Sequence, residues 1–406
     1  MRALITAVGS RGDVQPMLTL ALEMRRRGHD VLVHAPSDFE AWAADLGLPF
    51  RSSGVNTQEI LNQHREAIGG NPIRVIRALR DILFDEMPRA FDQTVEAARG
   101  MDVIVTAAQF AAHSVGDALR IPSITMMYAP TVLRSSYHAP LMGKMQGAPR
   151  WVNRLRWKLA DGAVQWLLGG VLNKERARLG LAPLTNVSRH LFEERPALLA
   201  CDPVVGPAPP DWNGYDVTVT GPLYYEDAAA LDPRVEAFLD AGPPPVYVGF
   251  GSMTSPDASR LTHAILEGGR GRRLLLAKGW AGIGGANLPA SVMVVDEPMP
   301  HAKLFPRVAA VVHHGGSGTT AAALRAGAPQ VIVPHIVDQY YFAHRLEKLG
   351  IAPAGIPIGK LTPERLARAI DATTALPAAP RTQAAARLKD GSGVRLAAQA
   401  IEKHVH

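Results

Sequence analysis

The sequence predicts an α/β protein built from two doubly wound, Rossmann-like halves. Short β-branched runs alternate with segments of helical periodicity in both halves, which is the pattern of parallel sheets covered by helices. A stretch rich in proline and glycine, residues 202–216, separates the two series. With 406 residues, the chain is also too long for one ordinary hydrophobic core, which favours two domains of roughly 200 residues each.

The first half opens with a strand, a helix and a second strand. The segment between the two strands has apolar residues at Val14, Met17, Leu18 and Ala21, which is helical spacing. The same alternation returns further along this half, and it indicates parallel pairing. The predicted strands are 3–7, 31–35, 103–108 and 123–129, and the predicted helices are 14–27 and 111–119. The less regular stretches 51–100 and 130–180 are long enough to add further helices to this sheet.

The second half repeats the alternation after the proline-rich stretch. Its apolar runs are short and bounded by glycine or proline, as expected for strands buried in a parallel sheet. The segments predicted to hold strands are 243–252, 272–280, 291–297, 308–316 and 329–335, and the predicted helices are 258–267, 319–326 and 339–348, followed by alanine-rich helices after residue 362.

These elements predict four parts of the chain. Residues 1–205 form the first domain, 206–217 the linker and 218–390 the second domain. The remaining residues, 391–406, contain a final helix with two open placements. It either crosses back to the first domain or packs on the second.

Composition excludes several classes of protein. The chain is 47% hydrophobic and 20% charged, and no stretch approaches the ~18 uninterrupted apolar residues of a membrane span. The first apolar run has no cleavage pattern, so it indicates a strand and not a secretory signal. Cys201 is the only cysteine, which rules out an intrachain disulfide and suits a reducing cytoplasm. The net charge of +6 is spread along the chain, which favours small anionic ligands over nucleic acid.

A glycine-rich turn after the run 308–312 is the first candidate site. It consists of His313, His314, Gly315, Gly316, Ser317, Gly318, Thr319 and Thr320, with a helix expected to begin at the threonines. Glycines let backbone N–H groups approach a ligand, and the helix N-terminus favours an anion such as a diphosphate. The alternative is a capped helix with a simple glycine turn. The turn is not a Walker loop, and two adjacent histidines with no further ligands do not indicate zinc.

Asp338 and Gln339 follow the next predicted strand and begin the next helix. A carboxylate and an amide at the same sheet edge as the glycine-rich turn could bind sugar hydroxyls. The alternative interpretation is an ordinary helix cap with a polar neighbour.

The first turn of the chain offers Ser10, Arg11 and Asp13. Asp13 lies just past the first strand, where its carboxylate would face the cleft between the two halves and could act as a general base. Its structural alternative is an N-cap worth roughly 1 kcal/mol, and the two roles are compatible. Ser252, in the turn after the first strand of the second half, is either a cap or a phosphate contact.

Several motifs together resemble one family. GSRGDVQP at 9–16, AFLDAGPPPVYVGFGS at 237–252, KGW at 278–280, VDE at 295–297, VAAVVHHGGSGTT at 308–320, RAGAPQVIVP at 325–334 and DQYYFA at 338–343 occur in this order. They resemble the glycopeptide-antibiotic (vancomycin-type) glycosyltransferases, which share the GT-B fold with macrolide, sterol and plant natural-product glycosyltransferases. The resemblance covers about residues 1–350.

The resemblance implies a role for each candidate residue. The second domain holds a UDP- or dTDP-sugar and the first holds a small-molecule hydroxyl acceptor, with the reaction in the cleft between them. The implied base is Asp13. The diphosphate contacts are Ser10, Arg11, Ser252 and the turn from His313 to Thr320, the sugar contacts are Asp338 and Gln339, and the nucleobase contacts are Trp280, Pro298 and Met299. Many relatives carry a catalytic histidine in the first loop, but this chain has none there.

The implied reaction is a displacement that inverts the configuration of a hexose, in the biosynthesis of an antibiotic or other natural product. A helix terminus, backbone donors and a histidine would stabilise the leaving diphosphate, and no D-x-D motif is present, so neither a metal nor another cofactor is expected.

Three other interpretations remain open. An epimerase would need further acid/base groups around the sugar, and no second carboxylate motif is apparent. A non-catalytic nucleotide-sugar-binding protein is disfavoured because Asp13 is retained. A transferase acting on a lipid or sterol at a membrane surface is suggested by the segment 148–170, which interleaves arginines with tryptophans. The favoured interpretation of this segment is an amphipathic helix packed on its own domain, with no membrane contact.

Overall fold

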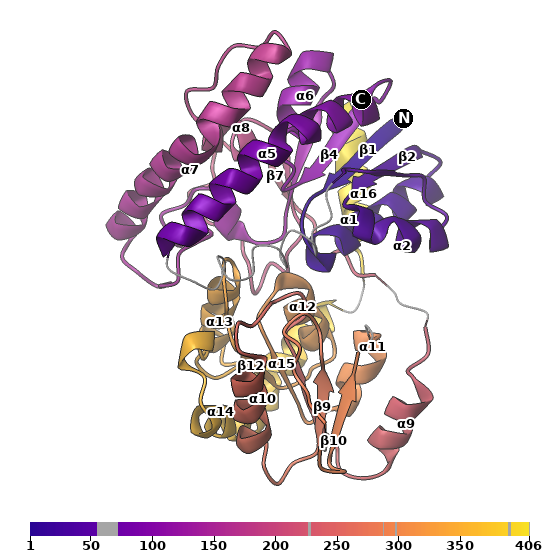
Figure 1. The fold of residues 1–406 in the computed structure, drawn as a ribbon, viewed down its shortest axis with the longest axis vertical. Helices are drawn as coiled ribbons and strands as arrows, with labels where there is room; N and C mark the ends of the chain where they lie inside the picture. The colour runs from indigo at the N-terminus through magenta and orange to yellow at the C-terminus, as the bar shows by residue number, and fades with distance from the viewer. Residues whose placement is uncertain (55–71, 226–228, 287, 297–298, 389–390, 406) are drawn as a thin grey trace.

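The protein has two lobes, each built on a parallel sheet, and Figure 1 shows them one above the other. The computed structural model describes residues 1–54, 72–225, 229–286, 288–296, 299–388 and 391–405, and of residues 72–83 it describes only the backbone. Helices flank the strands in both lobes, which confirms the predicted fold class of two Rossmann-like halves.

The first lobe contains a sheet of seven parallel strands. The first strand of the chain lies inside this sheet, because its Ala3 pairs with Val31 on one side and with Val103 on the other. The strand order is β3 (Phe50–Ser52), β2 (Asp30–Ala35), β1 (Arg2–Ala7), β4 (Val103–Ala107), β5 (Ser123–Met127), β6 (Ala197–Leu199) and β7 (Val217–Val219). The helices are α1 (Arg11–Arg26), α2 (Glu40–Asp45), α5 (Pro72–Ala98), α6 (Ala112–Leu119), α7 (Arg150–Arg178) and α8 (Val187–Phe192), with 3-10 turns at Ser37–Phe39 and Pro130–Val132.

The second lobe contains a five-stranded parallel sheet. Its strand order is β10 (Val292–Val295), β9 (Leu274–Ala277), β8 (Val246–Gly249), β11 (Ala310–His313) and β12 (Gln330–Ile332). The helices are α9 (Pro233–Asp240), α10 (Ala258–Gly268), α11 (His301–Leu304), α12 (Ser317–Arg325), α13 (Gln339–Lys348), α14 (Pro363–Ala375) and α15 (Ala378–Leu388), with 3-10 turns at Phe305–Arg307 and Ile358–Lys360.

The predicted periodicities correspond to buried faces. On α1, Val14, Met17, Leu18 and Ala21 all lie in the core of the first lobe. The strands of both sheets carry apolar residues on both faces, because helices cover each side of a parallel sheet. Two long helices, α5 and α7, fill the stretches in which the sequence predicted additional helices.

The last strand of the first sheet lies at the end of the predicted linker and just beyond it. β7 begins at Val217, the last residue of the predicted linker, and pairs with β6 in parallel. The strand pairing therefore assigns Thr218 and Val219 to the first sheet. The division of the chain into domains at the predicted residues stays a prediction.

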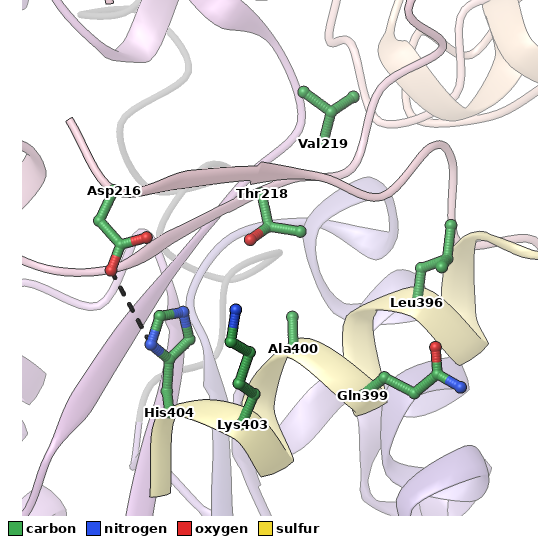
Figure 2. A pocket seen from close by; sticks show the side chains of 8 residues that line it. All are labelled: Asp216, Thr218, Val219, Leu396, Gln399, Ala400, Lys403 and His404. Carbon is green, nitrogen blue, oxygen red and sulfur yellow. Dashed lines mark ion pairs between the residues drawn. The ribbon is translucent and has the colours of Figure 1, made fainter. Parts of the chain in front are cut away.

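The last helix, α16 (Gly393–Val405), packs on the first lobe beside α1 (Figure 1). Ala397, Ala398 and Ile401 enter the core of that lobe. Figure 2 shows the other flank of the helix, where a cavity of about 290 Å³ lies between α16 and β7. Across it, Nδ1 of His404 lies 3.8 Å from Oδ2 of Asp216. The cavity contains none of the residues that the sequence predicted for the site.

An ion-pair cluster holds α16 on α1. Nε and Nη2 of Arg27 donate to the two carboxylate oxygens of Glu402 at 2.7 and 2.6 Å, and Nε2 of His29 lies 2.8 Å from Oε1 of Glu402. The hydrogen bonds from Arg27 are the main reason that the pKa of Glu402 is lowered to about 2.

We expect Glu402→Gln to lower the free energy of unfolding by about 1–3 kcal/mol at pH 7, because it removes hydrogen bonds to a charged group. Glu402 has a lowered pKa, so its contribution is present at neutral pH and is lost as the pH falls toward 2. Urea unfolding at pH 7 measures the change. Glu347→Gln, at an exposed position on α13, is the matched control, and an equal effect of both variants would contradict the ion-pair argument.

The two lobes are packed together in the described part of the chain. One apolar cluster combines Met127 and Leu199 of the first lobe with Ile332 and Phe342 of the second. Arg345 on α13 also donates from Nε and Nη2 to the carbonyl oxygens of residues 205 and 204, at 2.8 and 2.9 Å. The carboxyl ends of the two sheets are therefore brought toward one another.

Candidate active site

The candidate residues follow strands at the centre of each sheet. In the first sheet the strand order reverses between β1 and β4, and the helix after β1, α1, carries Asp13 in its first turn. In the second sheet it reverses between β8 and β11, and the loops after these strands carry Ser252 and His314. Open parallel sheets bind ligands at such crossover points, beyond the carboxyl ends of the strands.

Asp13 lies in the first turn of α1, three residues after Ser10. The backbone N–H of Ser10 donates to Oδ2 of Asp13 at 2.8 Å, and the Ser10 hydroxyl lies 3.3 Å from the same oxygen. The other oxygen, Oδ1, accepts no hydrogen bond from the described residues. Asp13 is thus not the N-cap itself, because Ser10 holds that position and fixes the carboxylate.

Gly9 permits this arrangement. Its φ is +127°, and a Cβ at this position would lie 2.3 Å from Oδ2 of Asp13. A side chain here would therefore displace the carboxylate. Arg11 is held on the first lobe, where its guanidinium lies 4.3 Å from the ring centroid of Trp42 and its Nε donates to Gln15.

The carboxylates of Asp13 and Asp338 interact although they belong to different lobes. Burial raises the pKa of Asp13, and the hydrogen bonds from Ser10 only partly oppose this shift. Burial, and then the charge of Asp13, raise the pKa of Asp338 to about 7. The fold therefore brings together the predicted base and the predicted sugar contact.

Tyr128 links the first lobe to the glycine-rich turn. Its hydroxyl donates to the backbone carbonyl of Asp13 at 2.8 Å, and its own carbonyl accepts a hydrogen bond from the Ser317 hydroxyl at 3.0 Å. Ser317 is the first residue of α12. The N-terminus of α12 is therefore held next to the segment that carries Asp13.

The two adjacent histidines have different environments. His313 is completely buried, with Nε2 2.9 Å from Oε1 of Gln330 and Nδ1 accepting from the N–H of Gly315 at 3.2 Å. Both ring nitrogens are occupied within the protein, so the His313 ring supports the loop from inside and is not presented to a ligand. We therefore omit it from the ligand contacts proposed below.

His314 faces the neighbouring turns of the second lobe. A Cβ on Gly251 would lie 3.4 Å from its Cε1, and a Cβ on Gly316 would lie 2.5 Å from its Nε2. Its Nδ1 is buried and has no hydrogen-bond partner among the described residues. Burial lowers the pKa of His314 to about 3, so the ring is neutral at pH 7.

The N-terminus of α12 provides hydrogen-bond donors. The first N–H groups of a helix have no partner within the helix, and here they belong to residues 317–319. Gly318 is exposed, and apart from its chain neighbours and the backbone of its own helix nothing lies within 4 Å of the position of a Cβ. The Thr320 hydroxyl is buried without a partner in the described structure. Two buried polar atoms without partners in one loop, on His314 and Thr320, are suited to a polar ligand.

Two further turns border this loop. The N–H of Trp280 donates to the carbonyl oxygen of Gly251 at 3.0 Å, which joins the turns after β9 and β8. Ser252 and Trp280 are both partly exposed at this edge. Met299 follows β10 and is partly buried against the core of the second lobe. Pro298 lies outside the described residues.

Asp338 and Gln339 lie at the start of α13 but differ in their contacts. Asp338 occupies the N-cap position without a capping hydrogen bond from its side chain, so its carboxylate does not act as an ordinary cap. Oε1 of Gln339 accepts from the N–H groups of His335 and Ile336 at 2.7 and 3.0 Å, and its Nε2 lies 3.3 Å from Sδ of Met253. Gln339 therefore organises the loop that presents Asp338.

Val337, directly before Asp338, has a φ of 45°. This left-handed conformation is rare for a β-branched residue and costs of order 1–3 kcal/mol. Such strain persists only where the surrounding structure imposes it, and the two hydrogen bonds to Gln339 supply that constraint. Periodicity did not reveal this feature, since it depends on backbone conformation.

We expect Asp338→Asn to stabilise the protein at pH 8 more than at pH 5. The raised pKa means that the folded state retains a proton that the unfolded state releases, so this residue's contribution to stability is lost as the pH rises toward 7. Asparagine cannot ionise, so the stability of the variant lacks this decrease as the pH rises. Thermal unfolding of both proteins at the two pH values is the measurement. Asp45→Asn, at an exposed position of α2, should show no such dependence.

The sequence did not reveal the hydrogen bonds by which Tyr128 joins the two lobes. The Tyr128 hydroxyl donates to Asp13, 115 residues away in the chain, and its carbonyl oxygen accepts from Ser317, 189 residues away. No local sequence pattern predicts contacts over such separations. Among the described residues, no group of three or more His, Cys, Asp or Glu is arranged to hold a metal ion. In the same part of the chain, no helix is both long and apolar enough to cross a bilayer.

Comparison with known proteins identifies the family. Residues 3–137 match the model of the glycosyltransferase family 28 N-terminal domain, and residues 280–404 match that of the C-terminal domain of erythromycin biosynthesis protein CIII-like proteins. Glycosyltransferase GtfE of Amycolatopsis orientalis is 36% identical, over 97% of this chain and 94% of the relative. The chain belongs to the GT-B glycosyltransferases.

Two further matches agree with this assignment. The vancomycin aglycone glucosyltransferase of Amycolatopsis orientalis is 35% identical to this glycosyltransferase, over 87% of the chain and 86% of the relative. The crystal structure of the glycotransferase of kitacinnamycin has a TM-score of 0.72 and 20% identity, and the match covers 99% of this chain and 98% of that one. At that identity the second match confirms the fold alone. The resemblance inferred from the motifs is thus confirmed, whereas the roles of individual residues stay predictions.

Proposed function

We propose that this glycosyltransferase moves a hexose from a UDP- or dTDP-sugar to a hydroxyl group of a lipophilic or aromatic natural product, with inversion at the anomeric carbon. The observation that carries the proposal is the position of the Asp13 carboxylate in the first lobe, near enough for its charge to help raise the pKa of Asp338, with its backbone joined through Tyr128 to the N-terminus of α12. One relative is named for the vancomycin aglycone, which supports a natural-product acceptor.

Asp13 is the proposed general base. Oδ1 is not used within the described structure, while Ser10 holds Oδ2, so the carboxylate is oriented and still able to accept a proton. The acceptor hydroxyl gives its proton to Asp13 as its oxygen attacks the anomeric carbon. The bond from that carbon to the diphosphate breaks on the opposite face, and the nucleoside diphosphate leaves with the electron pair.

The second lobe is the proposed donor site. The N–H groups of residues 317–319, the Thr320 hydroxyl, the His314 ring and Ser252 are placed to bind the diphosphate. Their dipoles and hydrogen bonds stabilise the negative charge that develops on the leaving diphosphate. We expect this step to need neither a metal nor another cofactor. Asp338 is the proposed contact to the sugar hydroxyls, with Gln339 holding its loop, and Trp280 and Met299 are the proposed neighbours of the nucleobase.

A panel of donors and acceptors tests the proposal. UDP-glucose and dTDP-glucose are each incubated with a glycopeptide aglycone, an aromatic polyketide, a flavonoid, a macrolide and a sterol, and the products are detected by mass spectrometry. Proton NMR of the glycoside gives its anomeric configuration, which should be opposite to that of the donor. Donor binding with neither transfer nor donor hydrolysis across the whole panel would instead identify a nucleotide-sugar-binding protein.

A further inference from the structure

The outer face of α7 is a row of exposed apolar and basic side chains. It consists of Trp151, Arg154, Leu155, Lys158, Leu159 and Trp166, which recur at intervals of three, four and seven residues and so share one side of the helix. The four apolar members are 68, 51, 66 and 65% exposed, in chain order. From Trp151 to Trp166 the row spans about 22 Å at the rise of an α-helix.

The opposite face of α7 is well packed, so this exposure does not come from a loosely placed helix. Trp157 is buried, and its Nε1 donates to the carbonyl oxygen of His138 at 3.2 Å. Nδ2 of Asn153 donates to the carbonyl oxygen of Ser136 at 3.0 Å, and Leu168 and Leu172 lie in a core cluster with residues of α5 and α6. Figure 1 shows α7 at the outer edge of the upper lobe. The apolar side chains on the outer face nevertheless remain more than half exposed.

The charge on this surface has one sign. Arg154 and Lys158 lie within the row and form no ion pair with the described residues, and Arg150 is exposed just before it. The only acidic residue from position 150 to 170 is Asp161, which pairs with Arg134. Long basic side chains beside tryptophan and leucine are the composition of helices that lie in the interface of an anionic bilayer.

The same surface continues to the second lobe beside the predicted sugar contact. Met142 and Met145, in the loop before α7, are 71 and 69% exposed. Between them, Nζ of Lys144 lies 6.0 Å from the ring centroid of Tyr340 on α13, and a Cβ on Gly147 would lie 3.1 Å from Cε1 of His344. This helix begins directly after Asp338. The loop that leads into the apolar row therefore contacts α13 of the second lobe.

We propose that the outer face of α7 docks the enzyme on an anionic lipid bilayer. The four apolar side chains enter the headgroup region, and Arg154 and Lys158 contact lipid phosphates. Charge complementarity and the convex shape of a helix with tryptophans at both ends favour a lipid surface over a folded protein partner. The proposal does not depend on Asp13 or on the identity of the acceptor, so it can fail while the proposed function holds.

Co-sedimentation of the full-length protein with vesicles tests the proposal. Vesicles of phosphatidylcholine and phosphatidylglycerol in equal amounts should bind the wild-type protein, vesicles of phosphatidylcholine alone should bind it much less, and added salt should weaken binding. The double variant Arg154→Gln/Lys158→Gln should bind the mixed vesicles about thirtyfold less, because each basic residue near the surface contributes about fivefold to the affinity. Trp151→Ser/Trp166→Ser should lose at least about tenfold.

Matched controls change the same residue types elsewhere. Arg260→Gln/Arg387→Gln removes two exposed charges from the second lobe, and Leu396→Ser removes an exposed apolar side chain from α16. Both should bind vesicles as the wild type does, and thermal unfolding checks that every variant folds.

Four outcomes overturn the proposal. The first is that the wild-type protein does not bind the mixed vesicles, and the second is that the α7 variants bind them as well as the controls do. The third is a dimer in light scattering that Trp151→Ser/Trp166→Ser dissociates, without vesicle binding, which would make the face a contact between copies. The fourth is binding of an acidic carrier protein to this face in place of vesicles.

Discussion

Asp13→Asn should lower kcat for sugar transfer by about 10² to 10⁴, the range expected for a positioned base, while leaving donor affinity unchanged within about twofold. Asparagine retains an oxygen that can accept the hydrogen bond from the N–H of Ser10, so the start of α1 should persist. The wild-type rate should also fall on the acid side as the carboxylate becomes protonated, at a pH above the ordinary aspartate range because burial raises the pKa of Asp13. Initial rates against pH, with donor binding by calorimetry, measure both effects.

Asp45→Asn is the control for this change, since Asp45 is an exposed aspartate in the same lobe and lies on α2. It should keep the wild-type rate and pH profile. Transfer by Asp13→Asn at the wild-type rate would falsify the assignment of the base. A large loss of donor affinity with kcat unchanged would instead place Asp13 among the donor contacts.

His314→Ala should reduce kcat/KM by about 10² to 10³, the cost of removing one donor from a site that stabilises developing charge. The neutral imidazole lies between Gly251 and Gly316 with its Nδ1 unbonded, so a bound diphosphate oxygen would supply the missing partner. The affinity for UDP and dTDP should fall together with the rate. Because the variant removes a buried polar atom that has no partner, its melting temperature should change little.

His263→Ala serves as the control, because His263 is an exposed histidine on α10 of the same lobe. Calorimetric titration with both nucleoside diphosphates separates binding from chemistry. If His314→Ala binds them as tightly as the wild type, the ring is no diphosphate contact. If it unfolds at a much lower temperature, the ring is mainly structural.

The elements of the fold were predictable because periodicity is a local property. The helix predicted at 339–348 has the same bounds as α13, and all five strands of the second sheet fall within the predicted segments. In the first sheet, β1, β2, β4 and β5 match predicted strands to within one or two residues, whereas the three-residue strands β3, β6 and β7 were not predicted. The candidate loops were predictable for a related reason: glycines, hydroxyls and carboxylates that follow strands are recognisable from spacing, and parallel strands bring such loops to one edge.

The use of each side chain was less predictable. His313 and Gln339 stand inside the recognised motifs, yet the structure uses His313 to support its loop and Gln339 to bind the backbone N–H groups of His335 and Ile336. Trp151 and Trp157 lie on the same helix six residues apart, and one is exposed while the other is buried. Residue type did not separate these cases, because burial depends on which elements pack against a given face.

By itself, the sequence determined the α/β class, the order of most strands and helices, and the candidate site residues, since each of these follows from neighbours along the chain. Only the tertiary structure decided where α16 packs, that Tyr128 joins Asp13 to Ser317, and that the apolar side chains on one face of α7 are more than half exposed. Glu402 and Arg27 are 375 residues apart in the chain, and Ser317 and Tyr128 are 189 apart. Contacts over such separations form when the lobes pack, so local patterns do not encode them.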